Sequence, residues 1–122
     1  MAGVLSQADD ASCIIYYGGS FDPLHIAHYL FVCALSAYCP RAQIWVSPTY
    51  RHAFDKQLSP FEDRVRMLRR AFSDIGNVEV STIERDLHET TSYTVDVVRA
   101  IRGAHPGYAI YVTVGADIVP TL

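Results

Sequence analysis

The sequence predicts an α/β protein in which a parallel sheet carries helices on both faces. Short apolar, β-prone runs alternate along the chain with longer segments of helical periodicity, in the order βαβαβαβ. This order calls for a parallel sheet with right-handed crossovers. The first run, at residues 13–17, is apolar throughout and stops at two glycines, as expected of a strand buried on both faces. Polar or glycine-containing segments lie where the strands end, at the edge where such sheets bind ligands.

Further strands are predicted at 44–47, 78–83 and 108–114, and the alternation within 78–83 indicates a more exposed position. A helix is predicted from His25 to about Cys39, because apolar residues recur there at helical spacing. These residues are Ile26, Leu30, Cys33, Ala34 and Ala37. The alternation of these strands and helices predicts a Rossmann-like parallel sheet.

The second helix follows a polar loop at 49–58. Ser59 is its expected N-cap, Pro60 suits the first helical position, and Glu62 completes a capping box. Its expected buried stripe consists of Phe61, Val65, Leu68 and Phe72. A third helix is expected to start at a cap formed by Ser92 or Thr91 and to end at Gly103. Its apolar positions are Val95, Val98 and Ile101, and one more helix is expected to start after the fourth strand.

The length of the chain, 122 residues, is enough for one domain, which is expected at 13–122 after a leader at 1–12. A net charge of −3 does not favour binding of nucleic acid over a broad positive surface. No apolar run is long enough to span a membrane. The cysteines are odd in number (Cys13, Cys33 and Cys39), which favours small core residues in a protein of a reducing compartment. A cytoplasmic protein is expected, and its oligomeric state stays open, a homo-oligomer included.

The segment 18–28 predicts an anion site. Gly18, Gly19 and Ser20 come directly after the first strand, and glycines let backbone N–H groups approach a ligand closely. The helix that follows directs its N-terminus, with free amides and partial positive charge, at the same place. The segment is neither a Walker A loop nor a G-x-G-x-x-G fingerprint. A phosphate is therefore the expected ligand.

Two histidines extend this site. His25 and His28 lie three residues apart, so they project from one face of the first helical turn. Imidazoles there can donate hydrogen bonds to phosphate oxygens and stabilise charge that develops in a transition state. An ordinary surface pair is the plainer interpretation of the two alone, but the strand, glycines and helix start around them favour the functional one. A protein-bound metal is not expected, because no third ligand lies at a suitable spacing.

The segment 18–28 resembles the signature of the HxGH nucleotidyltransferase superfamily, with Ala27 where the name of the motif has glycine. The likeness is closer to bacterial nicotinate-nucleotide adenylyltransferases. The segment 59–67, with Arg64 and Met67, resembles their helix after the substrate loop. The segments 91–96 and 114–117 are similar to their S-Y-T-x-[DE] and [IV]-G-[AS]-D motifs. The resembled family continues beyond the last residue here, so the C-terminal part of the domain is expected to be missing.

The resemblance implies AMP transfer from ATP to the 5′-phosphate of nicotinate mononucleotide, which yields deamido-NAD and pyrophosphate. It implies that Gly18, Gly19, Ser20 and Phe21 cradle substrate phosphate, and that His25 and His28 hold ATP phosphates. Asp117 would contact the ATP ribose beside Gly115, and Ser92, Tyr93 and Thr94 would border the pyridine ring. Mg²⁺ would arrive with ATP. Lys56 could reach a phosphate from the polar loop, where it and His52 resemble a displaced His-Lys pair, although a solvated lysine explains it equally well.

Several residues are given ordinary structural roles. The arginines at 64, 66, 69 and 70 are expected to form a solvated helix face. Trp45 and the tyrosines at 16, 17, 108 and 111 are expected in strands and core. The charged residues at 84, 85, 86 and 89 are expected in an exposed loop. Asp22 is expected to make a turn or cap.

Three functions stay open at this point, and a fourth, nucleic-acid binding, is supported only by the arginine cluster and opposed by the acidic balance of the chain. The first is the adenylyltransferase just described, with the activity of the 122-residue form left undecided. The second is a related nucleotidyltransferase that uses another phosphorylated acceptor. The third is a nucleotide-binding module without turnover.

Overall fold

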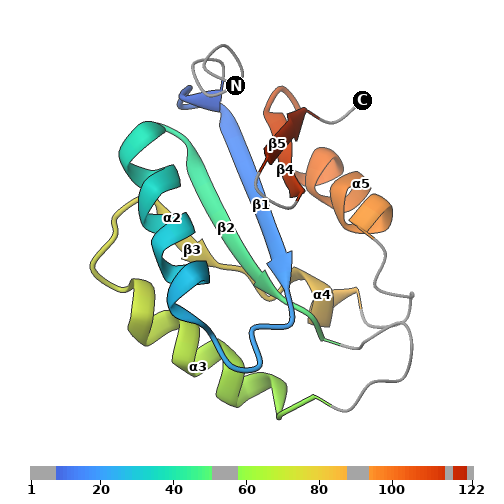
Figure 1. Cartoon of the computed structure of the whole chain (residues 1–122). Helices are drawn as coiled ribbons and strands as arrows, with labels where there is room; N and C mark the ends of the chain where they lie inside the picture. The colour runs from blue at the N-terminus through green and yellow to red at the C-terminus, as the bar shows by residue number, and fades with distance from the viewer. Residues whose placement is uncertain (1–7, 51–57, 88–93, 115–116, 121–122) are drawn as a thin grey trace.

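The computed structural model describes residues 8–50, 58–87, 94–114 and 117–120. In this part of the chain a five-stranded sheet has the order β3-β2-β1-β4-β5 (Figure 1). The strands are β1 (Cys13–Gly19), β2 (Gln43–Pro48), β3 (Val78–Val80), β4 (Ala109–Val114) and β5 (Asp117–Pro120). The helices are α2 (Ile26–Tyr38), α3 (Phe61–Phe72), α4 (Ile83–Asp86) and α5 (Thr94–Ala104).

The first four strands are parallel, as predicted. β1 lies at the centre, where Ile15 pairs with Ile44 of β2 and with Tyr111 of β4. β2 in turn pairs with β3 in parallel. The fifth strand differs from the expectation, because β5 runs antiparallel to β4 where a helix was expected to begin. Ile118 and Val119 are β-branched, and such residues favour a strand over a helix.

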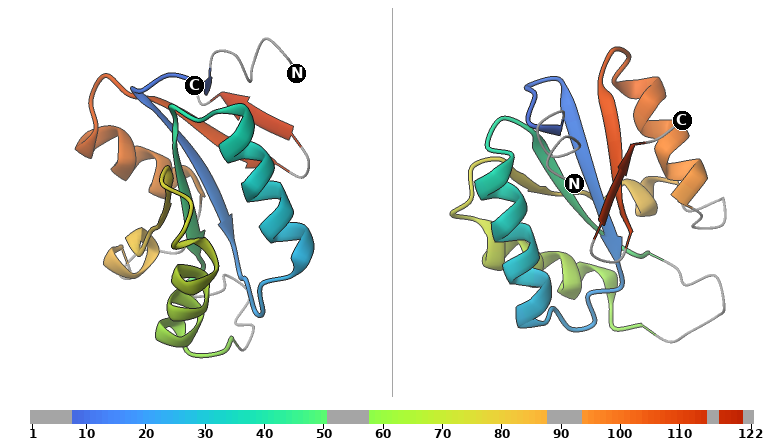
Figure 2. Two further views of the ribbon diagram at one scale, coloured as in Figure 1. Left: turned by 90° about the vertical axis from the view of Figure 1, so that its left-hand side faces the viewer. Right: turned by 45° about the horizontal axis from the view of Figure 1, so that its top comes forward.

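Helices cover both faces of the sheet, which confirms the predicted fold class. Alternate residues of the strands point to opposite faces. Ile15 belongs to a core cluster with side chains of α2 and α3, and Ile14 belongs to a second cluster with side chains of α5. Figure 2 shows α2 and α5 on opposite sides of the strands. Ala8 is buried in the first cluster, so packed structure begins before the first strand.

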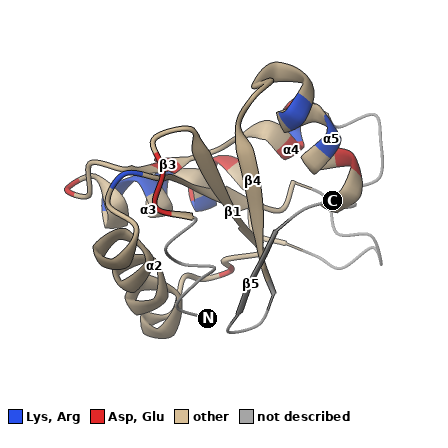
Figure 3. Cartoon of the chain, turned by 90° about the horizontal axis from the view of Figure 1, so that it is seen from above, with Lys and Arg blue, Asp and Glu red and all other residues tan. Residues whose placement is uncertain are grey.

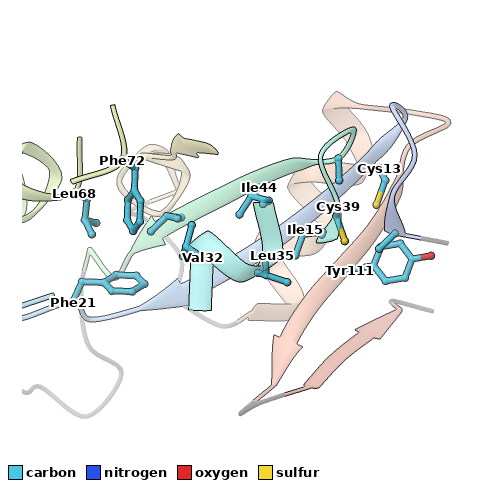
Figure 4. Close-up of a cluster of buried hydrophobic side chains, with 13 residues drawn as sticks. Cys13, Ile15, Phe21, Val32, Leu35, Cys39, Ile44, Leu68, Phe72 and Tyr111 are labelled. Atoms are coloured by element: carbon cyan, nitrogen blue, oxygen red, sulfur yellow. The ribbon is translucent and has the colours of Figure 1, made fainter. Parts of the chain in front are cut away.

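Helix α2 forms where its apolar spacing predicts a helix, but the residues of that spacing do not mark its buried face. Ile26 and Leu30 are 71% and 58% exposed, whereas Val32 and Leu35 are buried and face the sheet (Figure 4). The helix contains no charged residue (Figure 3). Because apolar residues surround nearly the whole helix, their spacing does not single out one face.

The predicted stripe of α3 is confirmed, since Phe61, Val65, Leu68 and Phe72 are all buried. Its predicted start is wrong. Pro60 occupies the N-cap position, without a side-chain cap hydrogen bond, and Phe61 is the first helical residue. Ser59 lies one position too early to cap this helix, and its backbone N–H instead donates to the Asp22 carboxylate.

Two smaller boundaries also differ. The third strand ends at Val80, and Ile83 begins the short helix α4. β3 is an edge strand of half-exposed residues, as the alternation indicated. Helix α5 runs one residue past Gly103, and Val95 is exposed whereas Val98 and Ile101 are buried.

The cysteines behave largely as expected. Cys13 and Cys39 are buried, Cys33 is half-buried, and all carry free thiols. Burial raises the pKa of the Cys13 thiol to about 12. Within the described ranges, no helix has the length and apolar character that crossing a membrane requires.

Candidate active site at the carboxyl ends of the strands

The predicted phosphate cradle lies at the carboxyl end of β1, in the middle of the sheet. Gly19 ends this strand, and the chain then crosses to His25, the N-cap of α2. The backbone N–H of Thr49, just after β2, donates to the Gly19 carbonyl at 2.9 Å. The ends of two neighbouring strands and the start of α2 therefore meet at one edge, as the sequence predicts.

A pocket of about 210 Å³ opens at this edge. It brings together Gly18, Gly19 and Thr94, which are predicted site residues from segments far apart in the sequence. The remaining lining residues are Tyr16, Thr49, Glu84, Val112 and Thr113. The pocket therefore joins the glycine pair to the first residue of α5.

Close packing explains why glycines stand in this turn. A Cβ atom on Gly18 would lie 2.9 Å from Cε1 of Tyr16, and one on Gly19 would lie 3.3 Å from Cζ of Phe21. The first distance is shorter than van der Waals contact allows. Any side chain at position 18 would therefore displace the Tyr16 ring, which also lines the pocket.

Phe21 anchors the cradle to the core. Its side chain is 3% exposed and lies in the cluster that contains Leu68 and Phe72 (Figure 4). The ring makes edge contacts with Tyr17 and His28, each at a centroid distance of 5.3 Å. Its backbone has φ +47°, a left-handed conformation that is rare for a residue with a side chain. Phe21 can therefore serve a ligand only through its backbone.

The two histidines are linked at the start of α2. The backbone N–H of His25 donates to Nδ1 of His28 at 3.1 Å, and the ring centroids lie 5.5 Å apart. Since Nδ1 accepts this bond, a neutral His28 ring carries its proton on Nε2. Burial lowers the pKa of His28, and the neighbouring His25 lowers it further. At neutral pH, His28 is therefore a neutral ring with a fixed donor at Nε2.

A tyrosine–glutamate pair lines the pocket. The hydroxyl of Tyr16 donates to Oε2 of Glu84 at 3.0 Å, and Glu84 is 8% exposed. Burial, then the charge of Glu84, raises the pKa of Tyr16 well above its usual range. The prediction that Glu84 lies exposed in a loop is wrong, whereas the expected core position of Tyr16 is confirmed.

Arg64 lies beneath the cradle and is only 3% exposed. Its Nη1 donates to the carbonyls of Ser20 and Thr49, at 3.1 and 2.7 Å, and its Nε donates to Ser59 at 2.9 Å. Burial lowers the pKa of Arg64, while Asp22 and Glu84 counteract this effect. The prediction of a solvated arginine face holds for residues 66, 69 and 70, which are exposed, and is wrong for Arg64.

Asp22 has the turn role that the sequence indicates. Its Oδ2 accepts the backbone N–H of Ser59 at 2.8 Å. This bond holds the end of the cradle against the segment that leads into α3. Asp22 and Arg64 therefore bind the two backbone groups of the same residue.

Several predicted site residues cannot be placed. Lys56, Ser92, Tyr93 and Gly115, together with His52, lie outside the described residues. Asp117 begins β5, where its backbone pairs with Val114. No group of three potential metal ligands occurs among the residues the structure describes.

Two charged residues of this edge, Arg64 and Glu84, are buried although their residue type predicts an exposed position. Arg64 lies three positions after Phe61 and four before Leu68, so the helical spacing already places it beside the buried stripe of α3. Glu84 follows the third strand, at the edge where parallel sheets hold their sites. In both cases position along the element was a better signal than residue type.

Comparison with known proteins identifies the family of this chain. The cytidylyltransferase-like family model matches residues 16–122. The chain belongs to this nucleotidyltransferase family, which confirms the resemblance read from the segment 18–28.

Within the family, the chain is similar to nicotinate-nucleotide adenylyltransferases. It is 35% identical to the probable enzyme of that name from Anaeromyxobacter dehalogenans, over 87% of this chain and 58% of the relative. It is 34% identical to the one from Geobacillus thermodenitrificans, over 87% of this chain and 50% of the relative. The chain thus spans about half the length of the curated relatives it matches.

Solved structures give the same result. The fold matches Plasmodium falciparum nicotinic acid mononucleotide adenylyltransferase complexed with NaAD, with a TM-score of 0.73 and 27% identity. This match covers 84% of the present chain and 51% of the other. A second structure of that protein, complexed with APC, matches with a TM-score of 0.70 at 25% identity, over 84% and 50% of the two chains.

Proposed function

We propose that the protein transfers AMP from ATP to nicotinate mononucleotide, giving deamido-NAD and pyrophosphate. The geometry of the cradle and of His28 is the main support for this proposal. The glycine turn at the carboxyl end of β1 leads to Phe21, whose ring contacts His28 in the first turn of α2, and Nδ1 of His28 accepts the His25 N–H. The names of the relatives add the substrate class.

The cradle suits phosphate for electrostatic reasons. Backbone N–H groups at the start of α2 carry partial positive charge, and the first turn of this helix contains no acidic residue. The buried charge of Arg64 lies beneath the same turn. Gly18, Gly19, Ser20 and Phe21 would bind phosphate oxygens through their backbone.

The proposed chemistry is an in-line displacement. A phosphate oxygen of the mononucleotide attacks the α-phosphorus of ATP, the new P–O bond forms, and the bond to pyrophosphate breaks. This mechanism requires no covalent enzyme intermediate, so the protein contributes positioning and stabilisation of negative charge. His28 would donate from Nε2 to an ATP phosphate oxygen, and His25 would make a second contact beside it. Such donors act most strongly where charge develops in the transition state.

The mononucleotide would lie in the 210 Å³ pocket whose lining includes Thr49 and Thr94. The resemblance assigns Ser92 and Tyr93 to the pyridine ring, Lys56 to a phosphate, and Gly115 and Asp117 to the ATP side. These assignments belong to the proposal. We further propose that residues 13–122 form one nucleotidyltransferase domain and that it acts in the cytoplasm, where its free thiols would stay reduced.

Mg²⁺ is the proposed cofactor. Because Mg²⁺ retains water and commonly binds through substrate phosphates, it would enter with ATP and neutralise charge on the phosphate oxygens. The described lining of the pocket holds a single carboxylate, Glu84, and this carboxylate accepts the Tyr16 hydroxyl. The proposal therefore assigns no protein ligand to the ion.

Pyrophosphate release tests the proposal. The protein is incubated with ATP and Mg²⁺, and with nicotinate mononucleotide, nicotinamide mononucleotide or phosphopantetheine as acceptor. We expect release only with a pyridine mononucleotide, and faster with the nicotinate form. Pyrophosphate release only in the reaction that contains phosphopantetheine as acceptor would identify a different transferase. Nucleotide binding without release at any concentration would identify a binding module.

A further inference from the structure

Arg64 joins three segments that border the cradle. The carbonyls that it binds belong to Ser20 after β1, Thr49 after β2 and Ser59 before α3. Its N–H donors thus reach 5, 15 and 44 positions along the chain. The guanidinium therefore lies where the cradle, the end of the neighbouring strand and the start of α3 come together.

Burying an arginine this completely is costly unless its donors are satisfied. Here backbone carbonyls accept hydrogen bonds from Nε and Nη1, and a guanidinium suits that task because its N–H groups diverge in one rigid plane. A lysine would keep the positive charge but offers one nitrogen on a flexible stem. The arrangement therefore depends on the shape of the guanidinium as well as on its charge.

The bond to Ser20 fixes the direction of the next N–H group. In a planar trans peptide the C=O and the following N–H point in opposite directions. Since the Ser20 carbonyl points toward Arg64, the N–H of Phe21 points away from it. This peptide leads into the left-handed backbone of Phe21, at φ +47°, which is unfavourable for a residue with a side chain.

We propose that Arg64 is a positioning residue that holds the Ser20–Phe21 peptide in place, so that the Phe21 N–H faces an anion bound in the cradle. The bond to Ser20 offsets the cost of the left-handed conformation, while the buried Phe21 ring fixes the other side of the residue. Arg64 itself does not touch the anion. The inference rests on the proposed function only for the statement that the anion is a nucleotide phosphate.

Arg64→Lys tests the inference, and Arg66→Lys is the matched control. Arg66 lies two positions away on the same helix, but it is exposed and pairs with Asp63 on the surface. Without ligand, the nuclear magnetic resonance signals of the Ser20 carbonyl and the Phe21 amide should shift in Arg64→Lys and stay unchanged in Arg66→Lys. Unchanged signals in a folded Arg64→Lys protein would overturn the inference.

The second readout is anion binding. Saturating inorganic pyrophosphate should shift the Phe21 amide proton in the unmodified protein. Arg64→Lys should weaken pyrophosphate binding about 10-fold or more, the size expected when one hydrogen bond to a charged group is lost. Arg66→Lys should change pyrophosphate binding by less than about 2-fold. If Arg64→Lys does not fold, the measurement on the unmodified protein decides, and an unmoved Phe21 amide overturns the inference.

The two proposals fail in different ways. A protein that shows the Phe21 shift with pyrophosphate but releases none from ATP would contradict the proposed function and leave the role of Arg64 intact. A protein that transfers AMP while Arg64→Lys keeps its KM for ATP and its Phe21 signal would contradict the role of Arg64 alone.

Discussion

Tyr16 on β1 donates a hydrogen bond to Glu84 on α4 at 3.0 Å, and the two residues are 68 positions apart in the sequence. Both line the pocket beside the glycine pair. The bond therefore connects the central strand of the sheet to the α4 segment on the wall of the site.

Tyr16→Phe removes this donor and keeps the ring. A hydrogen bond to a charged acceptor contributes about 1.5–3 kcal/mol, so the free energy of unfolding should fall by about that amount. Urea denaturation measures it. Tyr38→Phe is the control, because Tyr38 is largely exposed on α2 and should change stability by less than about 0.5 kcal/mol. Equal effects of the two variants would show that the bond contributes nothing.

Gly18→Ala should destabilise the protein, because the new Cβ would lie 2.9 Å from the Tyr16 ring. Such overpacking costs about 1–3 kcal/mol. Gly103→Ala should have the opposite effect, since open space surrounds its Cβ position inside α5, and alanine stabilises a helix over glycine by about 0.5–1 kcal/mol. Thermal unfolding of both variants checks the signs, and a neutral Gly18→Ala would contradict the packing account.

His28→Gln should flatten the loss of stability in mild acid. Burial holds the pKa of His28 below its value of about 6.5 in the unfolded chain. The unfolded chain therefore binds the proton first, so stability from the neutral ring is present above about pH 6.5 and is lost as the pH falls toward the lowered native pKa. Glutamine can still accept the His25 N–H as in a capping box. Urea titrations at pH 7 and pH 5 measure the difference, and an equal or steeper loss in the variant would refute the assignment.

His28→Ala should reduce turnover much more than mononucleotide affinity. A donor that acts on developing charge contributes about 10²–10³-fold to kcat, whereas ground-state binding depends on it less. Steady-state kinetics and a separate titration with nicotinate mononucleotide provide the two numbers. Losses of equal size would mean that His28 only binds.

The features that could be predicted from the sequence are those that depend on local sequence patterns. The order of strands and helices, the α3 stripe from Phe61 to Phe72 and the cradle at the end of β1 all depend on residues close together in the chain. The position of that cradle at the sheet edge then follows from the parallel topology, because such sheets bind ligands beyond their carboxyl ends.

Other features depend on partners far along the chain. Arg64 is buried because the carbonyls of Ser20 and Thr49 receive its donors, and Glu84 is buried because Tyr16 reaches it. Residue type alone assigns such charges to the surface. The buried face of α2 could not be predicted for a different reason, since an almost wholly apolar helix gives no contrast between its sides.

Following the α-phosphate of ATP tests the central claim most directly. The protein is incubated with Mg²⁺, nicotinate mononucleotide and ATP labelled at the α-phosphorus, and the products are separated. The proposed displacement breaks the bond between the α- and β-phosphates, so the label should appear in deamido-NAD and the pyrophosphate should be unlabelled. Label that stays in ATP, or that appears only in AMP or ADP, would contradict adenylyl transfer by this protein.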